Sequence, residues 1–188
     1  SGVEDPKRLQ WPKEVEEFRE ALAEAFAQAD CTARVVCKIL LERFGAVEDA
    51  KGLEELLDDP DEKFGPSVMR FFAYDNKACS WGSSPHADMG LVTVAPPSTS
   101  AALRLWHPKT GALVHPEEGL RPNEWVVFAG ETLGFLTGNA LPAPLHAVPG
   151  QPRQKDEAPR CSAPFFLRAA PGALLSSPSG KIKVTNRE

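Results

Sequence analysis

Hydrophobic residues in the first quarter of the chain recur every three or four positions, which is the spacing of one helix face. The pattern predicts a long helix from Trp11 to Phe44. Pro12 suits its first turn and Gly45 suits a C-terminal cap, while a break near Asp30 is compatible with the pattern. The apolar positions that carry this prediction are Val15, Phe18, Leu22, Phe26, Val36, Leu40 and Phe44.

Short apolar runs separated by glycine and proline begin at Ser67, after a short acidic helix expected around Leu53–Leu57. Seven or eight short strands with turn signals between them favour a sandwich or barrel over a parallel α/β sheet. The expected fold class is therefore α+β, mostly β. Pro149–Pro159 is expected to be a surface loop, and Ser176–Glu188 a polar, frayed tail. The expected strands are Val68–Tyr74, Leu91–Ala95, Ala102–Trp106, Glu124–Ala129, Thr132–Leu136, Leu145–Val148 and Ser162–Leu167.

Composition narrows the class of protein. With 188 residues, 42% of them hydrophobic and 25% charged, the chain is expected to form one globular domain. The net charge is −5 and lysine and arginine are scattered, which argues against a nucleic-acid or membrane partner. No apolar run approaches the roughly 20 residues of a membrane span, and no signal peptide opens the chain. We expect a cytoplasmic monomer with reduced thiols, because no Cys-x-x-Cys pair occurs among Cys31, Cys37, Cys79 and Cys161.

The segment His86-Ala87-Asp88 is the first feature that calls for a chemical explanation. In an extended segment, residues two apart point to the same face, so both side chains can reach one point. A third ligand must come from elsewhere, and His146 lies on another expected strand. Two imidazoles and one carboxylate leave coordination positions open, which suits non-haem iron(II). On its own, a His-x-Asp pair is more often incidental than a metal site.

Two other histidines compete for the third position. His107 and His115 each precede a proline and flank Lys109-Thr110-Gly111, which is typical of a hairpin tip. We therefore interpret both as exposed turn residues.

Taken in order along the chain, several segments resemble one family, the isopenicillin N synthase-like 2-oxoglutarate and iron(II)-dependent dioxygenases. The similarity runs from about Trp11 to Leu175 and is specific as an ordered set rather than in any one piece. The matching segments are Trp11-Pro12 with Phe18-Arg19-Glu20, Met69–Tyr74, His86–Val94, Gly130–Leu133, Leu136-Thr137-Gly138, Leu145–Val148 and Arg160–Arg168.

The resemblance implies a double-stranded β-helix (jelly-roll) core that binds Fe(II) between its two sheets, with His86, Asp88 and His146 as ligands. It assigns Arg160 and Ser162 to the distal carboxylate of the cosubstrate 2-oxoglutarate, with Tyr74 as a further hydrogen-bond donor. Physical reasoning agrees, because a guanidinium grips a carboxylate through charge-assisted bonds and residues two apart share a strand face. Candidates for the substrate pocket are Phe72, Leu91, Phe128 and Phe166.

The expected domain organisation is a helical region over residues 1–66, a jelly-roll core over 67–175 and a polar tail over 176–188. The expected function is a dioxygenase that hydroxylates or desaturates a small organic molecule with dioxygen. Because family members carry a sizeable segment before the long helix, we expect a truncated member. Two alternatives stay open: a non-catalytic jelly-roll remnant that acts as a metal-binding or interaction module, and a cupin-like zinc or manganese enzyme.

Overall fold

The computed structural model describes residues 16–44, 50–57, 65–74, 81–150, 158–179 and 183–185. It opens with the long helix α1 (Glu16–Arg43), which confirms the predicted helix over the described part of its range. The residues Trp11–Val15 lie outside the described residues. No break occurs at Asp30, whose carboxylate accepts hydrogen bonds from Arg34 Nε one turn later. A second helix, α2 (Ala50–Leu56), follows where a short acidic helix was expected.

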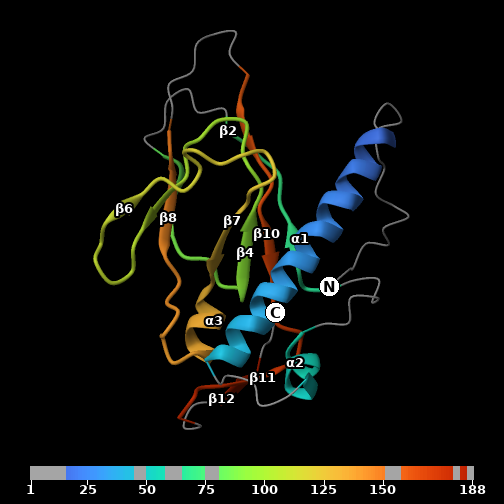
Figure 1. Ribbon diagram of the computed structural model, residues 1–188, viewed down its shortest axis with the longest axis vertical. Coiled ribbons are helices and arrows are strands. Elements are labelled where there is room, and N and C mark those ends of the chain that lie inside the picture. Colours follow the sequence, from blue (N-terminus) through green and yellow to red (C-terminus); the bar gives the residue numbers. More distant parts are fainter. Residues whose placement is uncertain are drawn as a thin grey trace.

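Within the described residues, the strands form two four-stranded antiparallel sheets and two small pairs (Figure 1). In the first sheet the order is β1 (Val68–Met69), β10 (Phe165–Leu167), β4 (Val92–Ala95), β7 (Val126–Ala129). In the second the order is β3 (Trp81–His86), β8 (Leu145–Pro149), β5 (Arg104–Trp106), β6 (Leu113–Val114). The strands β2 (Phe72–Tyr74) and β9 (Arg160–Ser162) form one pair, and β11 (Leu174–Ser176) and β12 (Lys183–Thr185) form the other. These pairings between distant segments build the expected jelly-roll.

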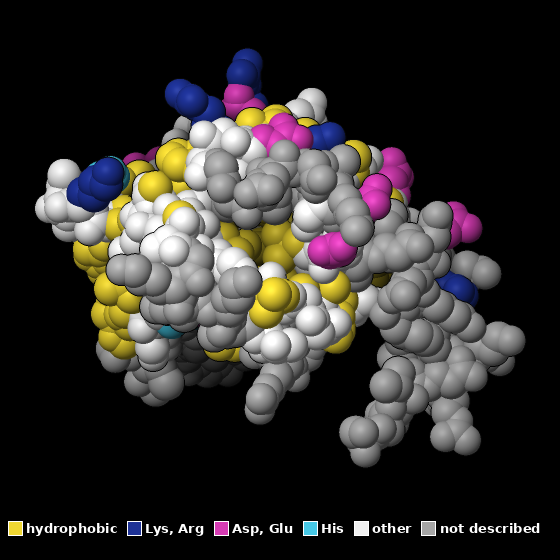
Figure 2. Space-filling view, turned by 90° about the horizontal axis from the view of Figure 1, so that it is seen from below, with side chains coloured by type: hydrophobic (Ala, Val, Ile, Leu, Met, Phe, Trp, Pro, Cys, Tyr) yellow, Lys and Arg dark blue, Asp and Glu magenta, His cyan; other side chains and the backbone are white. Residues whose placement is uncertain are grey.

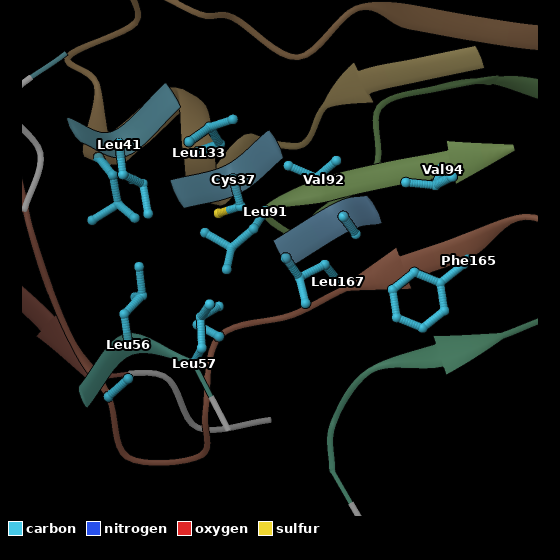
Figure 3. Packing of buried hydrophobic residues seen from close by; sticks show 14 of the residues in the cluster. Cys37, Leu41, Leu56, Leu57, Leu91, Val92, Val94, Leu133, Phe165 and Leu167 are labelled. Carbon is cyan, nitrogen blue, oxygen red and sulfur yellow. The ribbon is translucent and has the colours of Figure 1, made fainter. Parts of the chain in front are cut away.

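Helix α1 covers one face of the first sheet through a buried stripe of one residue per turn, three of which are small. Ala29, Ala33, Cys37 and Leu41 are fully buried and lie at i, i+4 spacing. Figure 3 shows Cys37 and Leu41 above Leu91 and Leu167. Small side chains let the helix approach the sheet closely. The larger apolar residues of the sequence pattern lie at the flanks of this stripe, where Phe26 packs edge-on against Phe165 with ring centroids 5.2 Å apart.

Two expected strands are each divided in the structure. Val68–Tyr74 becomes β1 and β2, which pair with β10 and β9 respectively, and Ser162–Leu167 is divided in the same way between β9 and β10. The division falls at Ala163-Pro164, where proline lacks the N–H that a continuous ladder needs. The Pro164 carbonyl instead accepts a hydrogen bond from Arg70 N at 3.0 Å. The chain therefore passes from one strand pair to the next at both places.

Two expectations are wrong, and one strand was not expected. Thr132–Leu136 is not a strand but part of helix α3 (Glu131–Leu136), whose first N–H groups donate to the carbonyls of Asp88, Met89 and Gly90. Strand β3 was not predicted, because its sequence Trp-Gly-Ser-Ser-Pro-His lacks apolar alternation. The expected frayed tail includes paired residues, since Ser176 pairs with Lys183 in the β11–β12 hairpin.

On the face shown in Figure 2, lysine and arginine side chains lie at separate places around the edge, and most aspartate and glutamate side chains lie toward the upper right. Among the residues that the structure describes, none of the helices combines the length and apolarity needed to cross a bilayer.

Candidate metal centre

The two histidines of the predicted triad lie opposite each other on neighbouring strands. His86 ends β3, His146 lies in β8, and the antiparallel register pairs them directly. Their ring centroids are 4.2 Å apart. Asp88 follows two residues after His86, and its Oδ1 lies 3.7 Å from His86 Nε2 and 3.6 Å from His146 Nε2. The fold therefore brings His146 together with a pair that is far from it in sequence.

Each imidazole is oriented by a carbonyl two residues before it. His86 Nδ1 lies 2.7 Å from Ser84 O, and His146 Nδ1 lies 3.3 Å from Pro144 O. A carbonyl oxygen can only accept, so Nδ1–H is the donor in both rings, and in a neutral ring the Nε2 lone pair then faces Asp88. Burial lowers the pKa of His146, as does nearby His86, while Asp88 opposes the shift. The neutral imidazole is the form that ligates a metal.

The carboxylate of Asp88 is buried and fixed by a hydroxyl. Thr93 Oγ1 donates to Asp88 Oδ2 at 2.5 Å, so Oδ1 is the oxygen that faces the histidines. Sequence reasoning missed Thr93, although one signal was present: it is a polar residue between Val92 and Val94 in an otherwise apolar strand. A buried hydroxyl there needs a partner, and the ligand carboxylate is that partner.

The loop that carries Asp88 is held against the start of α3. Glu131 N donates to Asp88 O at 2.7 Å, and Gly130 N donates to Leu91 O at 2.9 Å. A Cβ at position 130 would lie 2.1 Å from Gly90 O, so only glycine permits this approach. Helix α3 thus positions a metal ligand through backbone contacts.

The donor set fits one metal ion. The three ligand atoms all lie within 4.8 Å of one another, and metal–ligand bonds of about 2 Å let one ion bridge such separations. Two imidazole nitrogens and one carboxylate on one side match the facial arrangement of non-haem iron(II) sites. It is the one such cluster of His, Cys, Asp and Glu found among the described residues. His107 and His115 are exposed and lie apart from it, as expected.

One cavity joins the metal triad to the predicted cosubstrate residues. Its wall includes all three ligands, Arg160, Ser162 and Tyr74. Three of the four predicted pocket residues, Phe72, Phe128 and Phe166, also line it. Leu91 does not line this cavity, because it is fully buried in the core beneath α1 (Figure 3). The structure thus separates Leu91 from the pocket predicted for it.

The guanidinium of Arg160 is buried, and only some of its N–H donors have a hydrogen-bond partner. Its Nε donates to Ser100 O at 2.9 Å, and its Nη2 donates to both carboxylate oxygens of Glu117 at 3.0 and 3.2 Å. The Tyr74 ring centroid lies 4.9 Å from its central carbon, since Tyr74 and Arg160 are directly paired across β2 and β9. Nη1 is buried and has no hydrogen-bond partner among the described residues. An unpaired buried cationic donor is costly, which points to a ligand oxygen at this place.

Glu117 is the second residue that sequence reasoning missed. Besides Arg160, it accepts hydrogen bonds from Ser98 Oγ and from the backbone N–H groups of Ala102 and Leu103. Burial alone would raise its pKa, but these hydrogen bonds and the charge of Arg160 outweigh burial and lower it. In the sequence, Glu117 belongs to His-Pro-Glu-Glu-Gly, which looks like a solvent-exposed turn and carries no signal of a buried ion pair.

Residues 65–169 match the sequence model of the 2OG-Fe(II) oxygenase superfamily. Because this match covers more than half of the 188 residues, the chain belongs to that superfamily. The resemblance stated from the sequence is confirmed at this level. No curated protein sequence matches the chain.

Several solved structures share the fold. A full-length Neurospora crassa protein in complex with alpha-KG is 19% identical, with a TM-score of 0.72, and the match covers 94% of this chain and 57% of that one. A 2OG-Fe(II) oxygenase family protein from Caulobacter crescentus is 20% identical, with a TM-score of 0.73, and the match covers 94% of this chain and 58% of that one. The rice dioxygenase for auxin oxidation is 21% identical, with a TM-score of 0.66, and the match covers 96% of this chain and 59% of that one. The chain thus spans less than three-fifths of the length of these structures.

Proposed function

We propose that the protein is an iron(II)- and 2-oxoglutarate-dependent dioxygenase that oxidises a C–H bond of a small organic molecule, by hydroxylation or desaturation. One observation carries this proposal: the same cavity holds a three-residue metal site and a buried arginine with an unpaired donor. A metal site alone would fit a cupin-like zinc or manganese enzyme equally well. The unpaired Nη1 of Arg160 adds a site for a carboxylate, as a dicarboxylic cosubstrate requires.

In this proposal, His86, Asp88 and His146 would hold iron(II) at the wall of the cavity. Arg160 and Ser162 hold the distal carboxylate of 2-oxoglutarate from the same face of β9, and the ring of Tyr74 supports the guanidinium. Iron and 2-oxoglutarate together supply the chemistry, in which dioxygen oxidises the substrate while the oxo acid is converted to succinate and carbon dioxide.

The aromatic residues of the cavity have a separate task. Phe72, Phe128 and Phe166 line its wall, and the Phe128 ring lies 5.0 Å from the ring of His146. Apolar side chains at this distance keep bulk water from the metal ligands and leave room for an organic substrate. We assign the catalytic core to residues 67–175, with the helical region 1–66 as its support.

A small substrate is supported by what the similar structures contain. The Neurospora crassa protein was also solved in complex with alpha-KG and thymine, and JOX2 was solved with 2OG, Fe and JA. We further propose a monomer. We also propose a reducing compartment such as the cytoplasm, since Cys31, Cys37 and Cys161, the cysteines that the structure describes, are free thiols.

The test is anaerobic calorimetry with Mn(II) as a stand-in for iron, titrating 2-oxoglutarate into the metal-loaded protein. The proposal expects saturable binding that disappears without metal, and succinate release when iron and dioxygen are supplied. Metal binding without any heat at millimolar 2-oxoglutarate would overturn it and favour the cupin-like alternative. Binding of the oxo acid without succinate release under any tested substrate would favour the non-catalytic remnant.

A further inference from the structure

Glu117 forms a direct ion pair with Arg160, the predicted cosubstrate arginine, and is not one of the three candidate metal ligands. Its side chain and that of Arg160 are 7% and 6% exposed, and they meet at 3.0 Å, far along the chain from each other. Because both charges are desolvated, this contact strongly affects where the guanidinium lies. It also brings a negative charge close to the place where an anionic cosubstrate is expected.

The contact with Glu117 occupies one edge of the Arg160 guanidinium and leaves the Nη1 group without a partner among the described residues. Ser100 O accepts from Nε, and Glu117 accepts from Nη2, so these two groups clamp the outer edge of Arg160. Among the described residues only Nη1 finds no partner, at the wall of the cavity that also contains the metal triad. A planar guanidinium that is fixed along one edge has its remaining donors fixed as well.

Glu117 is itself held rigidly enough to act as such a clamp. Its Oε2 accepts the N–H groups of Ala102 and Leu103, both at 2.7 Å, and its Oε1 accepts Ser98 Oγ at 2.5 Å. The carboxylate therefore has bonds to the backbone of the 98–103 segment that do not depend on Arg160.

We propose that Glu117 is a positioning residue of the cosubstrate site: it clamps the Nη2 edge of Arg160, so that Nη1 is presented to the remote carboxylate of the oxo acid. The inference rests on the proposed function. It makes the oxo acid bind mainly through Nη1 and Ser162 rather than across both ends of the guanidinium. Two rival roles predict different outcomes: Glu117 competes with the oxo acid for Arg160, or it only anchors the 98–103 segment.

The substitution Glu117→Gln separates these roles. A glutamine oxygen in the place of Oε2 still accepts from Ala102 and Leu103, and Ser98 can reverse its hydroxyl to accept from the amide. The amide NH₂ then takes the place of Oε1 and faces Arg160 Nη2, donor against donor, so the 3.0 Å charge-assisted bond is lost and only the 3.2 Å contact to the remaining oxygen is left. Glu118→Gln is the matched control, because Glu118 is 70% exposed and contacts only His115 among the contacts found in the described part of the chain.

Calorimetry with Mn(II)-loaded protein then compares two ligands. 2-Oxoglutarate reaches both metal and arginine, whereas oxalate chelates a metal and has no remote carboxylate. We expect Glu117→Gln to weaken 2-oxoglutarate about tenfold, the size expected for one charge-assisted hydrogen bond. Oxalate and Mn(II) affinities should stay unchanged, and Glu118→Gln should change none of the three.

The sign of the effect decides between the roles. Removing a negative charge beside an anion by itself strengthens binding, so tighter 2-oxoglutarate binding in Glu117→Gln would establish competition and overturn the proposal. Equal 2-oxoglutarate binding by this variant and the parent would leave only the anchoring role. No 2-oxoglutarate binding by the parent would overturn the proposed function together with this inference, which distinguishes the two failures.

A second variant covers the case in which glutamine prevents folding. Glu117→Asp keeps the charge but shortens the reach, which draws the clamp away from Arg160. The proposal expects weaker 2-oxoglutarate binding, with oxalate unchanged. The competition role expects the reverse for 2-oxoglutarate, because the competing carboxylate has retreated.

Discussion

The hydroxyl of Thr93 donates a 2.5 Å hydrogen bond to Oδ2 of Asp88, and this bond selects which carboxylate oxygen faces the two histidines. Both residues are buried, and Thr93 lies in the middle of β4, so the donor is as rigid as the sheet. Groups that orient a metal ligand typically affect metal affinity by about 10- to 100-fold.

We therefore expect Thr93→Val, which keeps the side-chain shape, to lower Mn(II) affinity by at least about tenfold. Thr93→Ser keeps the hydroxyl and should stay within about threefold of the parent. Calorimetric titration of Mn(II) measures both, and circular dichroism checks that the fold is retained. Parent-like affinity in a folded Thr93→Val protein would show that Asp88 is oriented by other contacts.

The ligand assignment is tested by removing each candidate ligand in turn. His86→Ala, Asp88→Ala and His146→Ala should each abolish retention of iron(II) on a desalting column, because a three-ligand site has no spare donor. His107→Ala and His115→Ala should retain it like the parent, since both side chains are exposed and neither belongs to the cluster. Metal analysis of the five variants decides the point. A comparable loss in either control would contradict the assignment.

Elements whose pattern repeats locally could be predicted from the sequence, and elements decided by distant contacts could not. Helix α1 was predicted because apolar residues recur at helical spacing over many turns. For Thr132–Leu136 the apolar spacing fits both periods, and hydrogen bonds to the carbonyls of Asp88 and Met89 decide for a helix. These bonds link residues about forty positions apart, which no local window contains.

The candidate site follows the same rule. His86 and Asp88 are two residues apart, so their convergence needed only an extended segment, and the ordered family resemblance then indicated His146 and Arg160. Glu117 could not be found in this way, because its burial depends on the segment at Ser98–Leu103 folding over it. Leu91 was misplaced because an apolar residue beside a ligand strand can face either the cavity or the helix, and the pleat decides between them.

Arg160 separates an oxo-acid oxygenase from other proteins with this metal triad. We expect Arg160→Ala to weaken 2-oxoglutarate by about two to three orders of magnitude, since loss of one partner of a desolvated ion pair costs about 3–5 kcal/mol. Metal affinity should change far less. Arg160→Lys should restore part of the loss, because it keeps the charge beside Glu117 but not the planar donors. Ser162→Ala should cost about 1–2 kcal/mol.

Calorimetry with Mn(II)-loaded protein measures these affinities. Arg160→Ala also leaves the Glu117 carboxylate buried without its cation, so unfolding must be followed in parallel and the titrations made well below the melting temperature. A folded Arg160→Ala protein that binds 2-oxoglutarate as the parent does would contradict the cosubstrate assignment.

The thiols should differ sharply in reactivity. Burial against the sheet raises the pKa of Cys37 to about 12, with only partial opposition from Arg34, whereas Cys31 and Cys161 are exposed. Because the thiolate is the reactive form, Cys37 should resist iodoacetamide at a mildly alkaline pH in the folded protein and react once urea unfolds it. Mass spectrometry of labelled peptides assigns each site. Labelling of Cys37 as fast as Cys31 before unfolding would contradict the burial of this helix face.

The pKa of Glu117 gives a pH dependence of stability whose sign is fixed. A carboxyl whose pKa is lower in the folded than in the unfolded chain stabilises the fold above its unfolded value and loses this effect as the pH falls through the folded value. The ordinary value is 4.5, and the hydrogen bonds and Arg160 place the folded value below it. Glu117→Gln should therefore lower the free energy of unfolding by about 3 kcal/mol at neutral pH, as for a broken buried pair. This difference from the parent should shrink steadily as the pH drops below 4.5, because the parent then loses the same charge.

Urea unfolding of both proteins from neutral to acidic pH measures the difference, and Glu118→Gln controls for the loss of one surface charge. A difference that stays constant across this range would show that Glu117 acts through packing and neutral hydrogen bonds rather than as the anion that pairs with Arg160.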